Sequence, residues 1–304
     1  MTDYFYSNGK LLLSGEYAIL DGAEGWAIPT KFGQGLKITP SSSGILTWKS
    51  LDVDKNTWFK ASYTLADFKQ LSASDEAISK TLIGLLQEAR ALQPAFLSES
   101  AGCAVETELS FPRNWGLGTS STLINNIAQW AKIDAYSLLK KTFGGSGYDL
   151  ACAQHDHPIL FKIEEGQAVV RKANPTLSFV DQLYFVYLNQ KRNSREAIAA
   201  YRKRSINKLE LTTKITEITS ALIRAGSLSE FERLLNLHEH ILSTALDVRT
   251  IKEQLFSDYE GSIKSLGGWG GDFLLVTARK NTFDYFKAKG YSTIISYSDM
   301  ILKN

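Results

Sequence analysis

The spacing of apolar residues predicts strands in the first half of the chain and mostly helices in the second. Alternating or continuous apolar runs are typical of strands, whereas apolar residues three and four positions apart are typical of helices. Residues 75–92 have the helical spacing and begin with Asp75, a residue type that caps helix N-termini. The other elements expected in the first half are strands at 11–14, 30–40, 44–50 and 102–111, a helix at 119–132 and a hairpin over 157–173.

The pattern changes near residue 172, after which helices predominate. Strands first and helices afterwards predict an α+β protein of two lobes, with a boundary between residues 165 and 180. We therefore expect an N-terminal domain at 1–170 and a C-terminal domain at 171–304. The elements expected after the boundary are strands at 179–188, 273–278 and 292–298 and helices at 194–206, 209–225, 228–244, 248–259 and 281–290.

The composition is that of an ordinary globular protein, with 44% hydrophobic and 22% charged residues among 304. A formal net charge of +2 gives no field that would attract nucleic acid or an anionic membrane. The first ten residues lack the regions of a signal peptide, and no apolar stretch approaches the 18 residues of a membrane span. We expect a cytoplasmic protein in which Cys103 and Cys152 are buried small hydrophobic residues.

Glycine-rich turns interrupt the pattern at three places, 9–22, 112–122 and 267–272. In the second, PRNWGLGTSST, glycines turn the chain before hydroxyl residues that start a helix. The first N–H groups of a helix are unpaired and carry partial positive charge, so a phosphate fits there, and the hydroxyls could ligate Mg²⁺. A simple Ser or Thr N-cap is the alternative. The chain contains neither G-x-x-x-x-G-K-[ST] nor G-x-G-x-x-G.

Candidate charged groups stand in the first glycine-rich turn and in a fourth stretch, FGGSGYDLACA. Lys10 stands in the first glycine-rich turn, where Gly15-Glu16 leads into an expected helix and an exposed lysine is the simpler interpretation. Asp149 follows the glycines of FGGSGYDLACA, at the expected start of another helix. An aspartate there can be a helix-end charge, or it can accept the proton of a substrate hydroxyl group.

In their order and spacing, these stretches resemble the motifs of the GHMP small-molecule kinases, which include galactokinase, homoserine kinase, mevalonate kinase and phosphomevalonate kinase. The family's second motif, P-x-x-x-G-L-G-S-S, is the most specific of them. GYDLA, at 147–151, is similar to the G-Y-D-I-A sequence that labels one subgroup of the superfamily. The matching stretches are Gly9-Lys10, Gly15 to Ile19, Pro112 to Ser120, Ser146 to Asp149 and Gly267 to Asp272.

The resemblance implies a sheet-rich N-terminal lobe like domain 2 of ribosomal protein S5 and a ferredoxin-like C-terminal lobe, with the site between them. It implies transfer of the γ-phosphoryl group of ATP to a small molecule, which depends on positioning and charge neutralisation. Asp149 would take or orient the acceptor's proton, Lys10 would pair with Asp149, and Ser120 would lie near Mg²⁺. The residues implied around the ATP phosphates are Pro112, Gly116, Leu117, Gly118, Thr119, Ser120 and Ser121.

The acceptor is expected to be mevalonate or phosphomevalonate, because GEYAIL and KSLGGWGGD are more similar to phosphomevalonate kinase than to galactokinase or homoserine kinase. Lys191 and Arg195, beside Ser194 at an expected helix start, could grip a substrate phosphate. A solvated helix face is the alternative for such a basic run. The residues expected at the acceptor are Glu16, Tyr17, Ser146, Gly147, Lys191, Ser194, Arg195, Gly267, Gly268, Trp269 and Gly270.

The chain departs from the family motifs at two places. Mevalonate kinases, by the resemblance, have an acidic Mg²⁺ ligand upstream of the catalytic aspartate, whereas residues 135–147 here contain no Asp or Glu. Trp269 stands where the family usually has glycine, and a tryptophan does not adopt a positive φ cheaply. We expect φ below zero for Trp269, with its ring at the lobe interface, over the acceptor pocket or packed under the loop.

Two other functions fit the same motifs. A decarboxylase of the diphosphomevalonate type also uses ATP and an aspartate. A non-catalytic ligand-binding protein could keep the fold, although the intact Lys10, Ser120 and Asp149 count against it. We expect ATP and Mg²⁺ as cofactors and a small-molecule substrate as partner, without nucleic acid or membrane. The sequence leaves the oligomeric state, monomer or homodimer, open.

Overall fold

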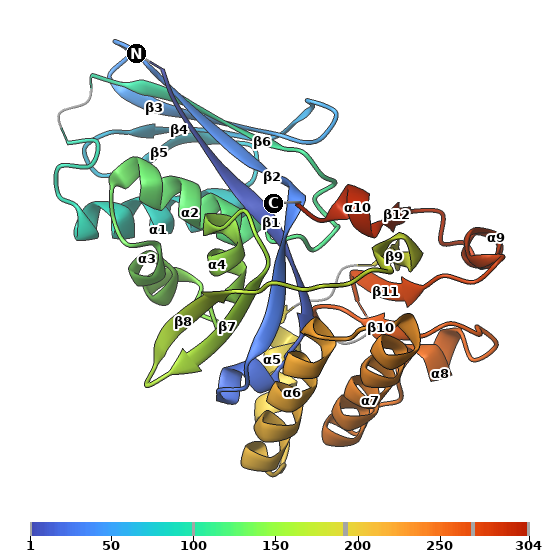
Figure 1. The fold of residues 1–304 in the computed structure, drawn as a ribbon. Coiled ribbons are helices and arrows are strands. Elements are labelled where there is room, and N and C mark those ends of the chain that lie inside the picture. The colour runs from blue at the N-terminus through green and yellow to red at the C-terminus, as the bar shows by residue number, and fades with distance from the viewer. Residues whose placement is uncertain (1, 99–100, 191–193, 269–270, 303–304) are drawn as a thin grey trace. The chain divides into compact units, whose positions relative to one another are not determined.

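The computed structural model describes residues 2–98, 101–190, 194–268 and 271–302 (Figure 1). The chain packs into two compact units that are interleaved along the sequence. The predicted division into 1–170 and 171–304 stays a prediction. Unit 1 consists of residues 1–9, 32–113 and 117–154, and unit 2 of residues 10–31, 114–116 and 155–304.

Unit 1 contains a sheet in the order β5-β4-β3-β6-β2, in which β3 and β6 are parallel and the other neighbours antiparallel. Side chains alternate between the two faces along each strand. Leu36 and Trp48 are buried on one face, whereas Lys37 and Lys49 are exposed on the other. The strands are β1 (Asp3–Ser14), β2 (Gly25–Pro40), β3 (Ile45–Leu51), β4 (Thr57–Thr64), β5 (Gln70–Ala73) and β6 (Cys103–Leu109), of which β1 and β2 continue into unit 2.

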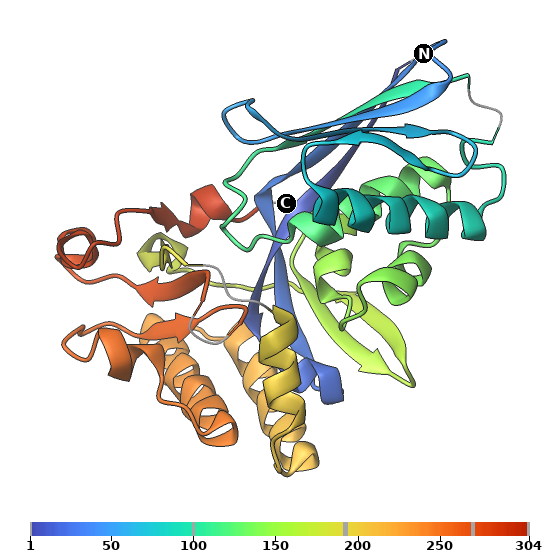
Figure 2. The ribbon, with the colours of Figure 1, turned by 180° about the vertical axis from the view of Figure 1, so that it is seen from behind.

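Helices cover the apolar face of this sheet, as Figures 1 and 2 show. Leu82 and Ile124 from the helices pack in one core with Trp48 and Phe59 from the strands. Asp75 accepts a hydrogen bond from the backbone N–H of Ile78, so the predicted N-cap is confirmed. The helices of unit 1 are α1 (Glu76–Leu92), α2 (Thr119–Ala131), α3 (Ala135–Thr142) and α4 (Tyr148–Gln154).

Unit 2 contains an antiparallel sheet in the order β10-β11-β9-β12. Its central strand β11 is buried along its whole length, which explains the continuous apolar run FLLV in the sequence. A hairpin of β7 and β8 pairs through β7 with residues 25–27 of β2. The strands are β7 (Ile159–Glu164), β8 (Gln167–Lys172), β9 (Leu183–Tyr187), β10 (Ile263–Ser265), β11 (Phe273–Thr277) and β12 (Ile294–Ser296).

The helices of unit 2 pack around a second set of buried apolar residues. Leu211 and Ile215 of α6 and Leu242 of α7 share a core with Tyr17 and Tyr201. Within the described residues, no helix is both long and apolar enough to cross a membrane. The helices are α5 (Ser194–Arg202), α6 (Lys208–Ile223), α7 (Leu228–Leu246), α8 (Ile251–Leu255), α9 (Thr282–Ala288) and α10 (Tyr297–Met300), with 3₁₀ turns η1 (Ala18–Asp21) and η2 (Val180–Gln182).

Most predicted elements are confirmed, and three are corrected. The helix expected after Glu16 is only the 3₁₀ turn η1, because Gly22 ends it in a left-handed conformation. The strand expected at 292–298 ends at Ser296, whose side chain caps α10. The helix expected at 248–259 spans only 251–255.

Candidate functional site

The second glycine-rich stretch ends at the N-terminus of α2 in unit 1. Gly118 is the N-cap residue, with φ +93°, and no side chain caps the first turn of the helix. Ser120 is exposed, whereas Ser121 is buried and donates its hydroxyl hydrogen bond to the Gly118 carbonyl at 2.9 Å. Because the N-cap residue is a glycine, it offers the first N–H groups of α2 no side-chain acceptor, which suits a helix end that binds an anion.

The preceding residues, 114–116, belong to unit 2. The Trp115 ring packs edge-on against Phe273 of β11, with ring centroids 5.5 Å apart. The Tyr187 hydroxyl group donates to the Asn114 carbonyl at 3.0 Å. Because both partners lie in the central strands of the sheet, the start of the loop is fixed to a rigid element.

Gly116 lies directly against the acidic residue of the third glycine-rich stretch. Its φ is +68°, and a Cβ atom there would lie 2.2 Å from the Asp272 carboxyl carbon. Asp272 is 8% exposed and has φ +52°, and its backbone carbonyl accepts from the Leu188 N–H at 2.9 Å. Burial, followed by the charge of Asp272, raises the pKa of the nearby Tyr187. Glycine is therefore required at 116 for space as well as for conformation.

The third stretch is described on both sides of its centre. Gly267 has φ +74°, and the Gly271 N–H donates to the Gly268 carbonyl at 2.9 Å. Trp269 and Gly270 lie outside the described residues. The expectations for the φ angle of Trp269 and for the position of its ring therefore stay predictions.

The aspartate of the S-G-x-D segment lies in the first turn of α4, so the predicted helix start is confirmed. Asp149 is half-buried. Gly147 has φ +88° and lies against the Tyr136 ring, 3.0 Å from where a Cβ atom would stand. The Tyr136 hydroxyl group is buried without a hydrogen-bond partner among the described residues, and burial is the first cause that raises its pKa to about 12. Ser146 precedes this contact and is half-buried.

A buried polar network joins α2 to α4 within unit 1. The Asn125 amide nitrogen donates to the Ser7 hydroxyl oxygen at 2.9 Å, and the Asn125 amide oxygen accepts from Gln154 of α4 at 3.1 Å. The Asn126 amide nitrogen donates to the Gln34 carbonyl at 2.9 Å. This network was not predicted, although two adjacent asparagines in the middle of an apolar helix are a signal of buried polar groups.

Residues 10–22 of the first glycine-rich stretch lie inside unit 2. Lys10, on β1, is 7% exposed. Glu16 is 3% exposed, and its carboxylate lies 2.5 Å from the ammonium group of Lys264. Tyr17 has φ +60°, and its ring stacks on Tyr201 with centroids 5.4 Å apart. The roles expected for Glu16 and Tyr17 at the acceptor stay predictions.

The basic residues expected at a substrate phosphate are only partly described. Ser194 begins α5, as the sequence predicts. Lys191 lies outside the described residues, and so do the side chains of Ser194 and Arg195. In the second glycine-rich stretch, 112–122, Pro112 is half-buried and Leu117 is buried.

The described residues contain no group of three or more His, Cys, Asp or Glu side chains that could hold a metal ion. The first turn of α2 offers hydroxyl groups as ligand atoms, among which that of Ser120 is exposed. Such a set suits a Mg²⁺ ion that arrives with nucleotide phosphates and keeps several waters.

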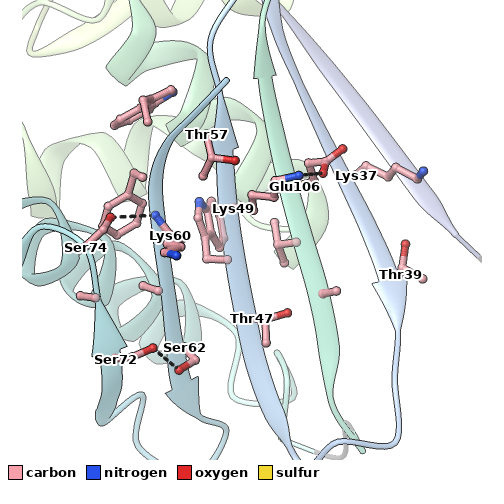
Figure 3. A pocket seen from close by; sticks show the side chains of 17 residues that line it. Lys37, Thr39, Thr47, Lys49, Thr57, Lys60, Ser62, Ser72, Ser74 and Glu106 are labelled. Atoms are coloured by element: carbon pink, nitrogen blue, oxygen red, sulfur yellow. Dashed lines mark hydrogen bonds and ion pairs between the residues drawn. The ribbon is translucent and has the colours of Figure 1, made fainter. Parts of the chain in front are cut away.

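A hollow of about 770 Å³ lies on the exposed face of the unit 1 sheet. Figure 3 shows Lys37, Lys49 and Lys60 around it, with Lys49 paired to Glu106 and small hydroxyl side chains on the strands between. None of the residues predicted for the functional site lines this hollow.

No protein-family model matches the chain, and no curated protein matches it by sequence. Solved structures match it over its whole length. The mevalonate kinase of Methanococcus jannaschii is 13% identical, with a TM-score of 0.73, over 100% of this chain and 99% of that chain. A Streptococcus pneumoniae phosphomevalonate kinase, in complex with phosphomevalonate and AMPPNP, is 17% identical, with a TM-score of 0.68, over 99% and 98%.

A sugar kinase shows the same likeness. The Lactococcus lactis galactokinase, complexed with galactose, is 13% identical, with a TM-score of 0.65, over 99% of this chain and 93% of that chain. The α+β class and the GHMP fold expected from the motifs are thereby confirmed. At identities this low the likeness establishes the fold: the chain has the fold of the GHMP small-molecule kinases from one end to the other.

Proposed function

We propose that the protein is an ATP-dependent kinase that phosphorylates a small molecule. The observation that carries the proposal is the N-terminus of α2, where Gly118 leaves the first turn without a side-chain cap. This helix end coincides with the motif that the resemblance assigns to the ATP phosphates. The similarity of the whole chain to several small-molecule kinases supports the same function.

The ATP phosphates would be held by the backbone N–H groups of the stretch 116–121. Positive φ at Gly116 and Gly118 allows the backbone to approach an anion closely. Mg²⁺, with Ser120 as the expected protein ligand, would neutralise charge on the phosphates. The absence of acidic residues from 135–147 leaves most of its coordination to phosphate and water.

Asp149 and Lys10 would act on the acceptor. In the reaction, the acceptor oxygen bonds to the γ-phosphorus while the bond from that phosphorus to the β,γ-bridging oxygen breaks and ADP leaves. Asp149 would accept or orient the proton of the attacking group, and the Lys10 ammonium would stabilise negative charge that develops there. The half-buried position of Asp149 at a helix start is compatible with this role.

For the acceptor we propose mevalonate or phosphomevalonate. The solved structures that match the chain include a mevalonate kinase from L. major in complex with R-mevalonate, at 17% identity. Ser194 and Arg195, at the start of α5, and Lys191 before it are the candidates for a substrate phosphate. We propose a cytoplasmic protein, and sedimentation would decide between monomer and homodimer.

An ADP-release screen tests the proposal. Purified protein with Mg-ATP would be offered mevalonate, phosphomevalonate, diphosphomevalonate, homoserine and galactose in parallel. A kinase releases ADP and leaves a phosphorylated product, whereas release of carbon dioxide from diphosphomevalonate would indicate a decarboxylase. ATP binding without turnover on any acceptor would instead support a non-catalytic binding protein.

A further inference from the structure

Four ionisable side chains lie buried together inside unit 2. Glu16 and Glu239 are each 3% exposed, and His238 and Lys264 are fully buried. They come from the first glycine-rich stretch, from α7 and from β10. We refer to these four residues as the Lys264 network.

Lys264 is the centre of the network. Its ammonium group lies 2.5 Å from one Glu16 carboxylate oxygen and 3.4 Å from a Glu239 oxygen, and it donates to the Ser265 carbonyl at 3.0 Å. The other Glu239 oxygen accepts from the Ser265 N–H at 3.2 Å. The lysine therefore has three oxygen acceptors, which uses its full donor capacity.

His238 connects the network to the backbone of the first stretch. Its Nε2 atom accepts a hydrogen bond from the Gly15 N–H at 3.2 Å, so this nitrogen carries no proton. Nε2 also lies 3.4 Å from a Glu16 oxygen. Burial, followed by the charge of Lys264, lowers the pKa of His238. The imidazole is therefore neutral and acts as an acceptor for the turn.

The turn that the network holds is strained. Gly15 has φ +103°, and a Cβ atom there would lie 2.7 Å from Gly25 Cα. Tyr17 has φ +60°, an uncommon value for a tyrosine. Such conformations persist only where the surroundings fix them, and they concentrate at functional sites. Each residue of the turn is held by a contact: Gly15 by a hydrogen bond to His238, Glu16 by its ion pair with Lys264, and Tyr17 by stacking on Tyr201.

We propose that Lys264 is a positioning residue, which acts through Glu16 to hold the Gly15–Tyr17 turn in this conformation. Lys264 also lies on β10, three residues before Gly267, where the third glycine-rich stretch begins, so one ammonium group connects two of the motifs. Buried ion pairs can often be replaced by neutral side chains without loss of stability, so stability alone gives no reason for this one. The effect on catalysis rests on the proposed function, in which this turn contributes to the acceptor site.

The test compares variants that differ in which bond they break. Lys264→Met alone leaves two buried carboxylates and can fail to fold. The triple variant Lys264→Met/Glu16→Gln/Glu239→Gln replaces all three ionisable groups by neutral ones at nearly constant volume and keeps the fold testable. Glu239→Gln alone leaves the pair of Lys264 and Glu16 intact. Lys162→Met, at the exposed pair with Glu164 at 3.0 Å, is the surface control.

Hydrogen exchange of the peptide that contains residues 15–17, followed by mass spectrometry, is the first measurement. We expect the triple variant to exchange there at least about tenfold faster, while peptides of β11 keep their protection. We expect its KM for the acceptor to rise by at least about tenfold, with the KM for ATP unchanged. Lys162→Met should match the wild type in both measurements, and Glu239→Gln should keep most of the protection of residues 15–17 because the pair of Lys264 and Glu16 is intact.

A folded triple variant with wild-type exchange at the turn would overturn the proposal. Unchanged acceptor KM in a variant whose turn does exchange faster would overturn the catalytic half of it. If the wild-type protein phosphorylates no acceptor, the proposed kinase function fails, whereas the exchange experiment still decides whether Lys264 holds the turn.

Discussion

The carboxyl group of Asp272 occupies the space beside Gly116 that any side chain at residue 116 would need. A Cβ atom at Gly116 would lie 2.2 Å from the Asp272 carboxyl carbon. Residues 156 positions apart in the sequence thus meet at the start of the expected phosphate loop. The loop conformation depends on this fit as well as on the positive φ of the glycine.

Gly116→Ala should therefore disturb the loop. We expect a loss of about 1–3 kcal/mol in the free energy of unfolding from backbone strain, and a rise of at least about tenfold in the KM for ATP. Thermal unfolding and steady-state kinetics measure the two effects. Gly84→Ala is the matched control, because Gly84 lies in α1 with open space around its Cα atom. It should stabilise the protein by about 0.5–1 kcal/mol. An equally stable Gly116→Ala variant with normal ATP kinetics would contradict the account of the loop.

Asn125→Ala should loosen the connections of α2 to β1 and to α4. The substitution leaves the Ser7 hydroxyl and the Gln154 amide without one buried partner, which costs about 1–3 kcal/mol. A double-mutant cycle with Ser7→Ala measures the coupling in the free energy of unfolding. We expect the two losses to be less than additive, since both variants break the same bond. Strict additivity would show that the bond contributes nothing.

Glu239 should make stability depend on pH. Burial, the largest cause, raises the pKa of Glu239 from 4.5 to about 7, although Lys264 acts against the increase. The folded protein therefore holds this proton where the unfolded chain has lost it. The contribution is complete below pH 4.5 and is lost as the pH rises through about 7.

Glu239→Gln should remove this dependence. Between pH 5 and 8 we expect the wild type to lose about 2–3 kcal/mol of unfolding free energy relative to the variant. Urea unfolding of both proteins between pH 5 and 8 provides the comparison. Parallel pH profiles would mean that Glu239 does not hold the proton.

The sequence was sufficient for features that depend on neighbouring residues. Three such local features are confirmed. They are the capping aspartate of α1, the helix after the second glycine-rich stretch and the position of Asp149 at a helix start. The order of the glycine-rich stretches was enough to predict the fold, which solved structures of 13–17% identity confirm.

Features formed by residues far apart in the sequence could not be predicted. Lys264 and Glu16 are 248 positions apart, and nothing around either residue indicates a buried partner. Strand β5 was missed because its four residues, QLSA, are too few for a pattern. Strand β4 was missed although its buried Phe59, Ala61 and Tyr63 have the alternation of a half-buried strand. Strand β10 was missed because three residues are too short for a pattern, and a buried lysine is at its centre.

Asp149→Asn tests the central claim most directly. The side chain keeps its shape but can no longer accept the acceptor's proton, so kcat should fall by about two to four powers of ten. The KM for ATP should stay near the wild-type value, since Asp149 is not expected at the phosphates. Mass spectrometry of the acceptor after incubation with Mg-ATP would detect the transferred phosphoryl group and give the rate for both proteins. We predict a phosphorylated acceptor with the wild type and almost none with Asp149→Asn; equal rates for the two proteins would contradict the account.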